Sequence, residues 1–183
     1  MAATADDTDT ADEIAAAWDR ERPGTPTESI GIVTRLWQLA KLFGEDRRRV
    51  LAAAGVDAAT LDLLSVLRRS SPPYTLSTRE LTRRTLVTAG AISQRVARAE
   101  RDGLVRRRTD PHERTVWVEL TEAGHEVVER TVDLVLRREL ELLDTLDADR
   151  RRQLSELLRI LLRDVQARTG NQGLTHVGES SVD

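Results

Sequence analysis

The chain has 183 residues, of which 39% are hydrophobic, 32% are charged and only 3% are aromatic. This composition suits one globular domain, or one domain with tails, and it excludes disorder throughout, collagen-like repeats and a disulfide scaffold. No apolar run approaches the ~20 residues that cross a bilayer, and the acidic N-terminus lacks the basic start and apolar stretch of a signal peptide. We therefore expect a soluble, cytoplasmic protein with no membrane partner.

The residue types restrict the chemistry as well. The chain has no Cys, and His112, His125 and His176 are too scattered to act together as metal ligands. We also find no Ser-His-Asp constellation, no glycine-rich phosphate loop and no carboxylate cluster with an evident cleft. We therefore expect no metal, no cofactor and no enzymatic activity.

Both ends of the chain are expected to be disordered tails. Residues 1–12 are rich in acids, Thr and Ala, and residues 167–183 contain Gly and Ser with little periodicity. After the first tail, Ile14 and Trp18 lie four residues apart, which places them on one face of a short helix. We expect this added N-terminal helix to span residues 13–22.

Long helical patterns flank the middle of the chain. Residues 28–56 keep an apolar helical period, and residues 121–166 contain two further amphipathic helices, the second capped by Asp147. The last helix has a broad apolar stripe that must be buried against something. Its positions are Leu154, Leu157, Leu158, Leu161, Leu162 and Val165. The economical arrangement brings these terminal helices together as the interface of a homodimer.

Residues 57–120 have the signals of short helices followed by a hairpin. Asp57 and Thr88 are predicted helix N-caps, and Ser77 with Glu80 forms a capping box. A glycine ends the last of these helices, and two strand-like runs follow, LVRRR and TVWVEL, joined by the turn TDPHER. The predicted fold is therefore mainly α, with a small β-hairpin.

A basic segment coincides with these helices and strands. Residues 79–108 hold nine arginines and three acids, a net charge of +6, although the whole chain has a net charge of −3. Two helices, a tight turn and a basic hairpin are the order of a winged helix-turn-helix, in which the second helix enters the major groove and the hairpin, or wing, reaches the flanking backbone. We therefore predict a winged helix-turn-helix that binds double-stranded DNA, with long dimerisation helices on both sides.

Candidate DNA contacts lie on the second helix and on the wing. Ala89 and Gly90 permit close approach to DNA, while Ser93 and Gln94 can hydrogen-bond to base edges, Gln best to adenine. Arg114 is the natural contact at the wing tip. The complete set of candidates is Ser77, Thr88, Ala89, Gly90, Ser93, Gln94, Arg98, Arg106, Arg108 and Arg114.

From about Glu28 to Gln166 the chain resembles the MarR family of dimeric winged-helix regulators. The resemblance is carried by LSTRELTRRTLVTAGAISQRVARAERDGLVRRRTDP and by VELTEAG after it. The wing departs from the family pattern, because DPHERT has Glu113 and Thr115 and is about one residue shorter, and Ala99 stands where a Leu is usual. The resemblance implies a dimeric regulator, in most cases a repressor, on a pseudo-palindromic operator.

A narrower resemblance concerns the signal to which the protein responds. The added helix, GVDAATLDLLSVLRR, TAGAISQR and GLVRR are together similar to the urate-responsive branch of the family. That resemblance implies a ligand site made of Trp18, Asp62, Arg95 and Arg107. The set suits an anionic planar purine, because guanidinium groups pair with anions and an aromatic ring can cover the purine. Strand alternation lets Arg107 point inward, and we expect it to be the charge partner of Asp62.

Other interpretations of the same residues stay open. Within the family, the ligand is alternatively a phenolic or drug-like apolar compound, although such a ligand has little use for paired guanidinium groups. In another class of function, the helical bundle is a protein-binding scaffold without DNA. Trp18 alone can be an apolar anchor for its helix, Asp62 a solvated residue and Arg95 a phosphate contact.

Overall fold

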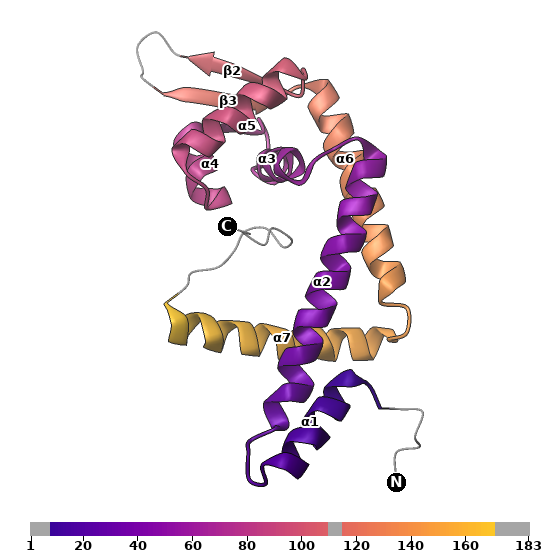
Figure 1. The fold of residues 1–183 in the computed structure, drawn as a ribbon. Coiled ribbons are helices and arrows are strands. Elements are labelled where there is room, and N and C mark those ends of the chain that lie inside the picture. The colour runs from indigo at the N-terminus through magenta and orange to yellow at the C-terminus, as the bar shows by residue number, and fades with distance from the viewer. Residues whose placement is uncertain (1–7, 110–114, 171–183) are drawn as a thin grey trace. The chain divides into compact units, whose positions relative to one another are not determined.

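The computed structural model describes residues 8–109 and 115–170 (Figure 1). Their fold is mainly helical with one small antiparallel sheet, and this confirms the predicted fold class. The elements are α1 (Thr10–Glu21), α2 (Glu28–Ala54), α3 (Ala58–Arg68), β1 (Thr75–Ser77), α4 (Thr78–Thr85), α5 (Ala89–Arg101), β2 (Val105–Thr109), β3 (Val116–Leu120), α6 (Glu122–Leu142) and α7 (Ala148–Thr169).

The chain divides into two compact units, residues 1–46 and residues 47–183. Parts of the two predicted tails, residues 1–7 and 171–183, lie outside the described residues. The same is true of Arg114, the proposed contact at the wing tip.

The first unit begins with an acidic helix cap. The Asp9 side chain accepts hydrogen bonds from the backbone N–H groups of Ala11 and Asp12, and the Asp12 carboxylate accepts one from the Asp9 N–H. Arg35 on α2 binds both carboxylates, with Nε 2.8 Å from Asp9 and Nη2 2.6 Å from Asp12. The hydrogen bond from this guanidinium lowers the pKa of Asp9 to about 2. The predicted helix start at residue 13 is wrong by three residues, because reciprocal capping starts α1 at Thr10.

α2 is one continuous helix that runs from the first unit into the second. Gly55 follows it with φ +70°, so the helix ends close to the predicted boundary at residue 56. Among the described helices, none alone combines the length and hydropathy of a membrane span. α2 and α3 pass that test only as a pair, and the pair is bent by 84° at its break.

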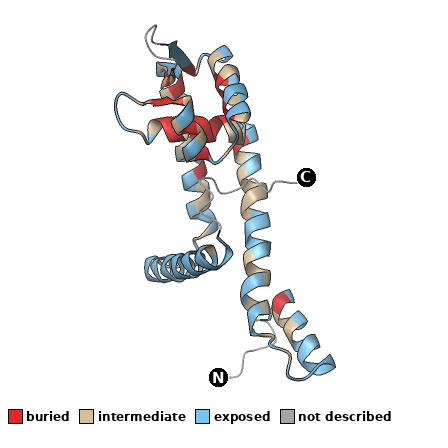
Figure 2. Ribbon diagram, turned by 90° about the vertical axis from the view of Figure 1, so that its left-hand side faces the viewer, coloured by how far each residue is buried: buried red, intermediate tan, exposed pale blue. Residues whose placement is uncertain are grey.

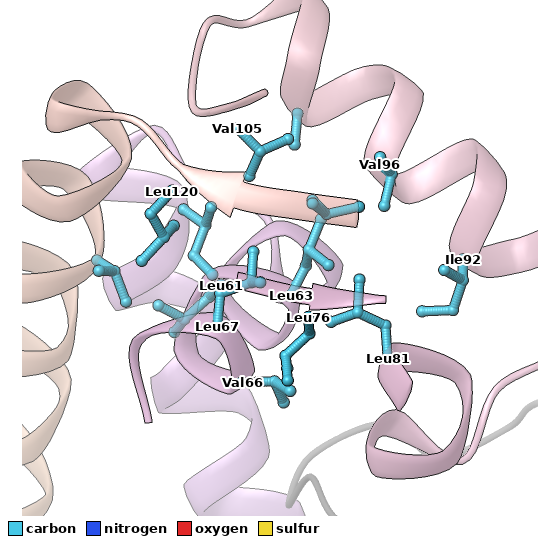
Figure 3. Packing of buried hydrophobic residues seen from close by; sticks show 14 of the residues in the cluster. Leu61, Leu63, Val66, Leu67, Leu76, Leu81, Ile92, Val96, Val105 and Leu120 are labelled. Carbon is cyan, nitrogen blue, oxygen red and sulfur yellow. The ribbon is translucent and has the colours of Figure 1, made fainter. Parts of the chain in front are cut away.

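The core of the second unit surrounds α3. Asp57 caps this helix, as predicted, by accepting the backbone N–H of Thr60 at 2.9 Å. Leu61, Leu63 and Leu67 are at most 2% exposed, and each such buried side chain stabilises the fold by about 1.5–3 kcal/mol. Apolar residues from the surrounding elements converge on α3 (Figure 3). They include Leu76, Leu81, Ile92, Val96, Val105 and Leu120.

The sheet has three strands where the sequence predicts a two-stranded hairpin. The strand order is β1-β3-β2 and both pairs are antiparallel. β1 has three residues, too few for an alternation pattern, and its last residue, Ser77, also caps α4. Leu76 on β1 and Arg107 on β2 both lie opposite Val118 on β3. The additional strand therefore fastens the wing to the start of α4 and leaves β2 at one edge of the sheet.

The end of α5 and the start of β2 pack against the first turn of α6. The Thr121 N–H donates to the Leu104 carbonyl at 3.2 Å, and its hydroxyl donates to the Gly103 carbonyl at 2.7 Å. A Cβ built on Gly124 would lie only 2.0 Å from the Leu104 carbonyl oxygen. The absent side chain of Gly124 is therefore what permits this close approach.

α7 carries the apolar stripe that the sequence predicts. Asp147 caps the helix, as predicted, and the helix continues to Thr169, beyond the expected end at residue 166. It has no buried residue, and Figure 2 shows it exposed along its length. Leu157 and Leu162 are 59% and 58% exposed. Within the second unit, the described residues 47–109 and 115–170 therefore do not cover this stripe.

Candidate nucleic-acid interface and ligand residues

Helix caps fix both the start of α4 and the turn between α4 and α5. The Glu80 N–H donates to Ser77 Oγ at 3.2 Å, and the Ser77 N–H donates to the Glu80 carboxylate at 3.0 Å. Thr88 Oγ1 accepts the Ala91 N–H at 3.2 Å. Leu86 ends α4 in the left-handed region, with φ +56°. Both predicted caps are confirmed, and Leu86 and Thr88 form the turn between the two helices.

Ser77 does not fit its predicted place among the DNA contacts. Its side chain is buried, and its hydroxyl donates to the Glu80 carboxylate at 2.8 Å. Thr88 also caps a helix, but it is exposed on the surface. We therefore assign Ser77 a structural role and retain Thr88 as a candidate contact.

α5 has a buried face and an exposed face. Ile92, Val96 and Ala99 are at most 1% exposed and belong to the core. The opposite face starts with two residues that have little or no side chain, followed by residues with hydrogen-bonding or cationic groups. These exposed residues are Ala89, Gly90, Ser93, Gln94 and Arg98. The face suits a helix that approaches DNA closely and reads base edges.

β2 carries arginines on both faces of the sheet. Arg106 Nε donates to Glu119 at 2.9 Å, and Arg108 Nη1 lies 4.0 Å from the same carboxylate. Both arginine side chains are about 70% exposed. Arg107 lies on the other face, as alternation predicts, and Trp117 lies opposite Arg108. Arg106 and Arg108 are therefore exposed cations on the outer face of the wing.

Arg98 lies between the exposed face of α5 and the start of α3. Its Nη2 is 3.2 Å from Asp57 Oδ2, and its side chain is 59% exposed. An exposed pair of this kind contributes about 0–1 kcal/mol, so little opposes its exchange for a pair with a phosphate. Arg98 therefore stays a candidate DNA contact.

Asp62 and Arg95, two of the four proposed ligand residues, contact each other. Asp62 Oδ2 lies 3.2 Å from Arg95 Nη1 and joins α3 to α5. Asp62 is 4% exposed and the Arg95 side chain is 16% exposed. Burial of these charges is tolerated because they are paired. The guanidinium group of Arg95 is thus held at the junction of the two helices, and the alternative of a simple phosphate contact is less favoured.

Arg107 is bonded to Glu100, so the predicted pair of Arg107 with Asp62 is wrong. Glu100 accepts the Arg107 backbone N–H at 3.0 Å and its Nε at 2.7 Å. The side-chain hydrogen bond from Arg107 lowers the pKa of Glu100. Sequence reasoning missed Glu100, because a pair that spans a helix end and a strand follows no periodic spacing. The available signal was complementary charge between α5 and β2.

Trp18, the fourth proposed ligand residue, belongs to the first unit. It lies on α1, and its side chain is 49% exposed. Ile14, four residues earlier, is 39% exposed. The structure places Asp62, Arg95 and Arg107 in the second unit. Three of the four proposed residues thus belong to one unit. Among these three, Asp62 and Arg95 contact each other and Arg107 pairs with Glu100.

A further cluster of titratable side chains joins α3, the residue before β1, and α6. His125 packs edge-on against Tyr74 with ring centroids 4.7 Å apart, and the guanidinium of Arg68 lies 4.9 Å from the Tyr74 ring. Arg68 also pairs with Glu129 at 2.8 Å. Across residues 8–109 and 115–170, no three His, Asp or Glu side chains gather as potential metal ligands. We assign this cluster a structural role.

Comparison with known proteins identifies similar regulators. A model of the MarR family matches residues 54–114. Sco3205, a MarR family transcriptional regulator from Streptomyces coelicolor solved in complex with DNA, is 30% identical, and the match covers 75% of this chain and 92% of that chain with a TM-score of 0.61. A mutant of MarR from E. coli, complexed with operator DNA, is 26% identical over 73% of this chain and 97% of that chain, with a TM-score of 0.57.

A curated relative extends the comparison. The HTH-type transcriptional regulator PecS from Dickeya dadantii is 24% identical over 147 residues, which are 80% of this chain and 89% of that protein. In each of these three comparisons the match covers most of this chain and most of the other protein. They therefore extend well beyond the basic segment of this chain, residues 79–108.

Proposed function

Because the chain belongs to the MarR family of winged-helix transcriptional regulators, we propose that it is a homodimeric repressor that a small anionic ligand releases from a pseudo-palindromic operator. The observation that carries this proposal is the exposed face of α5, with Ser93, Gln94 and Arg98, together with the exposed Arg106 and Arg108 of the wing. Small, polar and cationic groups in this order suit a recognition helix flanked by phosphate contacts.

The proposed roles divide between base reading and backbone contact. Ser93 and Gln94 read base edges in the major groove, where Gln recognises adenine by a pair of hydrogen bonds. Arg106 and Arg108 contact phosphates on the flank and set the register without reading sequence. Two relatives solved in complex with DNA support DNA binding itself as a proposal for the present chain.

The proposed dimer follows from large apolar side chains that are exposed to solvent in the described part of the chain. Residues of α7 and α2 include large apolar side chains with more than a third of their surface exposed. A lone chain in water is destabilised by so much exposed apolar area, whereas a second copy can cover it. A dimer also presents two recognition helices to half-sites about 34–36 Å apart.

For the ligand we propose urate or a closely related purine. Arg95 and Arg107, both in the second unit, supply guanidinium groups for an anion. The resemblance of the sequence to the urate-responsive branch adds Trp18 as the aromatic member of the set. Arg95 is already paired with Asp62, and Arg107 is already paired with Glu100. An anionic ligand therefore competes with two internal carboxylates. It releases DNA only if it binds more tightly to an arrangement of α5 and the wing that fits DNA poorly.

DNA binding is tested by fluorescence anisotropy with labelled duplexes from the region upstream of the protein's own coding sequence. We expect saturable binding to a pseudo-palindromic site, with an affinity that falls steeply between 50 and 200 mM salt because bound phosphates release counterions. An unrelated duplex of equal length is the control. Equal affinity for every duplex, or none for any, would contradict the proposed function.

The ligand is tested by titrating urate into the preformed operator complex. We expect release from the parent protein, and a weaker response after Arg107→Ala or Trp18→Phe. Trp37→Phe is the matched control for Trp18→Phe, because Trp37, 74% exposed on α2 in the proposed dimer surface, belongs neither to the DNA contacts nor to the ligand residues. Light scattering checks that this variant stays dimeric. Asp62→Asn is expected to change operator affinity without urate. If urate does not release the parent protein from its operator, the proposed purine ligand is wrong and the DNA-binding proposal still stands.

A further inference from the structure

β2 is an edge strand of the sheet and carries the wing arginines. In the order β1-β3-β2 it pairs with β3 on one side only. In an antiparallel pair, alternate backbone N–H groups point away from the partner strand, so an edge strand presents unpaired donors. The Arg107 N–H is one of these outward donors. It is bonded to the carboxylate of Glu100 on α5 and not to β3.

Glu100 binds this edge with both of its carboxylate oxygens. Its Oε1 accepts the Arg107 backbone N–H at 3.0 Å, and its Oε2 accepts Arg107 Nε at 2.7 Å and also pairs with Nη2. The carboxylate therefore bonds the main chain and the guanidinium group of one residue together. Such charge-assisted, bidentate contacts constrain direction as well as distance.

Two backbone hydrogen bonds also fix the turn between α5 and β2, but neither reaches as far along β2 as the Glu100 contact. The Leu104 N–H donates to the Ala99 carbonyl at 2.8 Å, and the Gly103 N–H donates to the Glu100 carbonyl at 3.0 Å. These bonds fix the chain where it leaves α5. The side chain of Glu100 reaches further, onto the third residue of β2, and so opposes rotation of the strand about that corner.

We propose that Glu100 is a positioning residue for DNA binding, which holds the wing at a fixed angle to the recognition helix by binding the main chain and side chain of Arg107. The inference rests on the proposed function. The exposed face of α5 and the two arginines on the outer face of β2 have to meet DNA simultaneously. Without the Glu100 contact, β2 can rotate about its start. This rotation weakens the phosphate contacts of the wing and leaves the base contacts of α5 in place.

The test compares operator affinity, its salt dependence and a hydroxyl-radical footprint for Glu100→Ala and Glu100→Gln. Glu100→Ala is expected to weaken binding about three- to fivefold, as for loss of a partly exposed ion pair. It should lower the log–log salt slope by about 0.9 for each phosphate that the wing no longer binds. Protection at the outer flanks should fade while the centre of each half-site stays protected. Glu100→Gln keeps an acceptor for the Arg107 N–H and should retain most of the affinity.

Glu119→Gln is the control for hydrogen exchange alone, because Glu119 pairs with Arg106 and Arg108 within the hairpin and its change also alters these proposed phosphate contacts. A second readout is amide hydrogen exchange at Arg107 in the free protein. Protection should be lost in Glu100→Ala and retained in Glu119→Gln. A parent without operator binding overturns the proposed function. A parent that binds, with a Glu100→Ala variant of unchanged footprint and salt slope, overturns the positioning role alone.

Discussion

Gly124→Ala tests whether the first turn of α6 determines how the wing is held. In an ordinary helix this substitution stabilises the protein by up to about 1 kcal/mol, because Gly has the lower helix propensity. Here the new Cβ would lie 2.0 Å from the Leu104 carbonyl oxygen and 3.0 Å from its carbonyl carbon. Ordinary van der Waals contact begins near 3.4 Å, so backbone must move by more than 1 Å.

The expected cost follows from what that movement breaks. Overpacking against backbone costs about 1–3 kcal/mol, and the hydrogen bond from Thr121 to the same carbonyl, at 3.2 Å, contributes about 1 kcal/mol more. After subtraction of the gain in helix propensity, Gly124→Ala should lower the free energy of unfolding by about 1–3 kcal/mol. For a chain of this length the melting temperature should fall by roughly 2–12 °C.

The assay is urea unfolding followed by circular dichroism, at a fixed protomer concentration because a dimer's stability depends on it. Gly90→Ala is the matched control, since the nearest atom to a Cβ there is 4.0 Å away. It should leave stability unchanged or slightly raised. If Gly124→Ala is as stable as the parent, the close approach of α6 to the start of the wing does not determine how the wing is held.

Three further predictions concern other parts of the chain. Arg35→Ala should raise the pKa of Asp9 from about 2 towards 3.8, measured by NMR titration of the carboxyl group. Because the folded-state pKa is lowered, the contribution of this pair is complete above about pH 4 and is lost as the pH falls towards 2, and an unchanged titration excludes the pairing. Leu161→Glu should give monomeric or unfolded chain in light scattering and abolish operator binding, and a folded monomer with full affinity contradicts the dimer. Ser77→Ala should cost about 1 kcal/mol in urea unfolding through loss of the α4 cap, whereas a cost near zero removes that role.

The helix boundaries that side-chain caps define were predictable from sequence. Asp57, Thr88 and Asp147 each cap a helix where expected, because an N-cap acts within three residues and leaves a local signal. β1 was missed, since three residues have no usable period and the strand forms only when β3 is beside it. Asp9 and Asp12 also form a local cap, in which each carboxylate accepts the other residue's backbone N–H. The start of α1 was nevertheless missed by three residues, because the acidic residues 1–12 were interpreted as a disordered tail.

The candidate site shows the same division between local and non-local information. Alternation along β2 predicted that Arg107 points away from its neighbours, but not that Glu100 rather than Asp62 binds it. Asp62 and Arg95 are 33 residues apart, and only the packing of α3 against α5 brings them together. Ion pairs between two different helices or strands depend on tertiary geometry. Composition and spacing therefore indicate which charged residues are candidates, but not which of them pair with each other.

Base discrimination by Gln94 tests the central claim most directly. Operator duplexes carrying every single base-pair change in one half-site are titrated with the parent protein and with Gln94→Ala at one salt concentration. We expect Gln94→Ala to lose discrimination at one position, by about 1–3 kcal/mol, and to keep it elsewhere, because α5 presents Gln94 on its exposed face. An identical preference at every position for both proteins would contradict the assignment of α5 as the recognition helix.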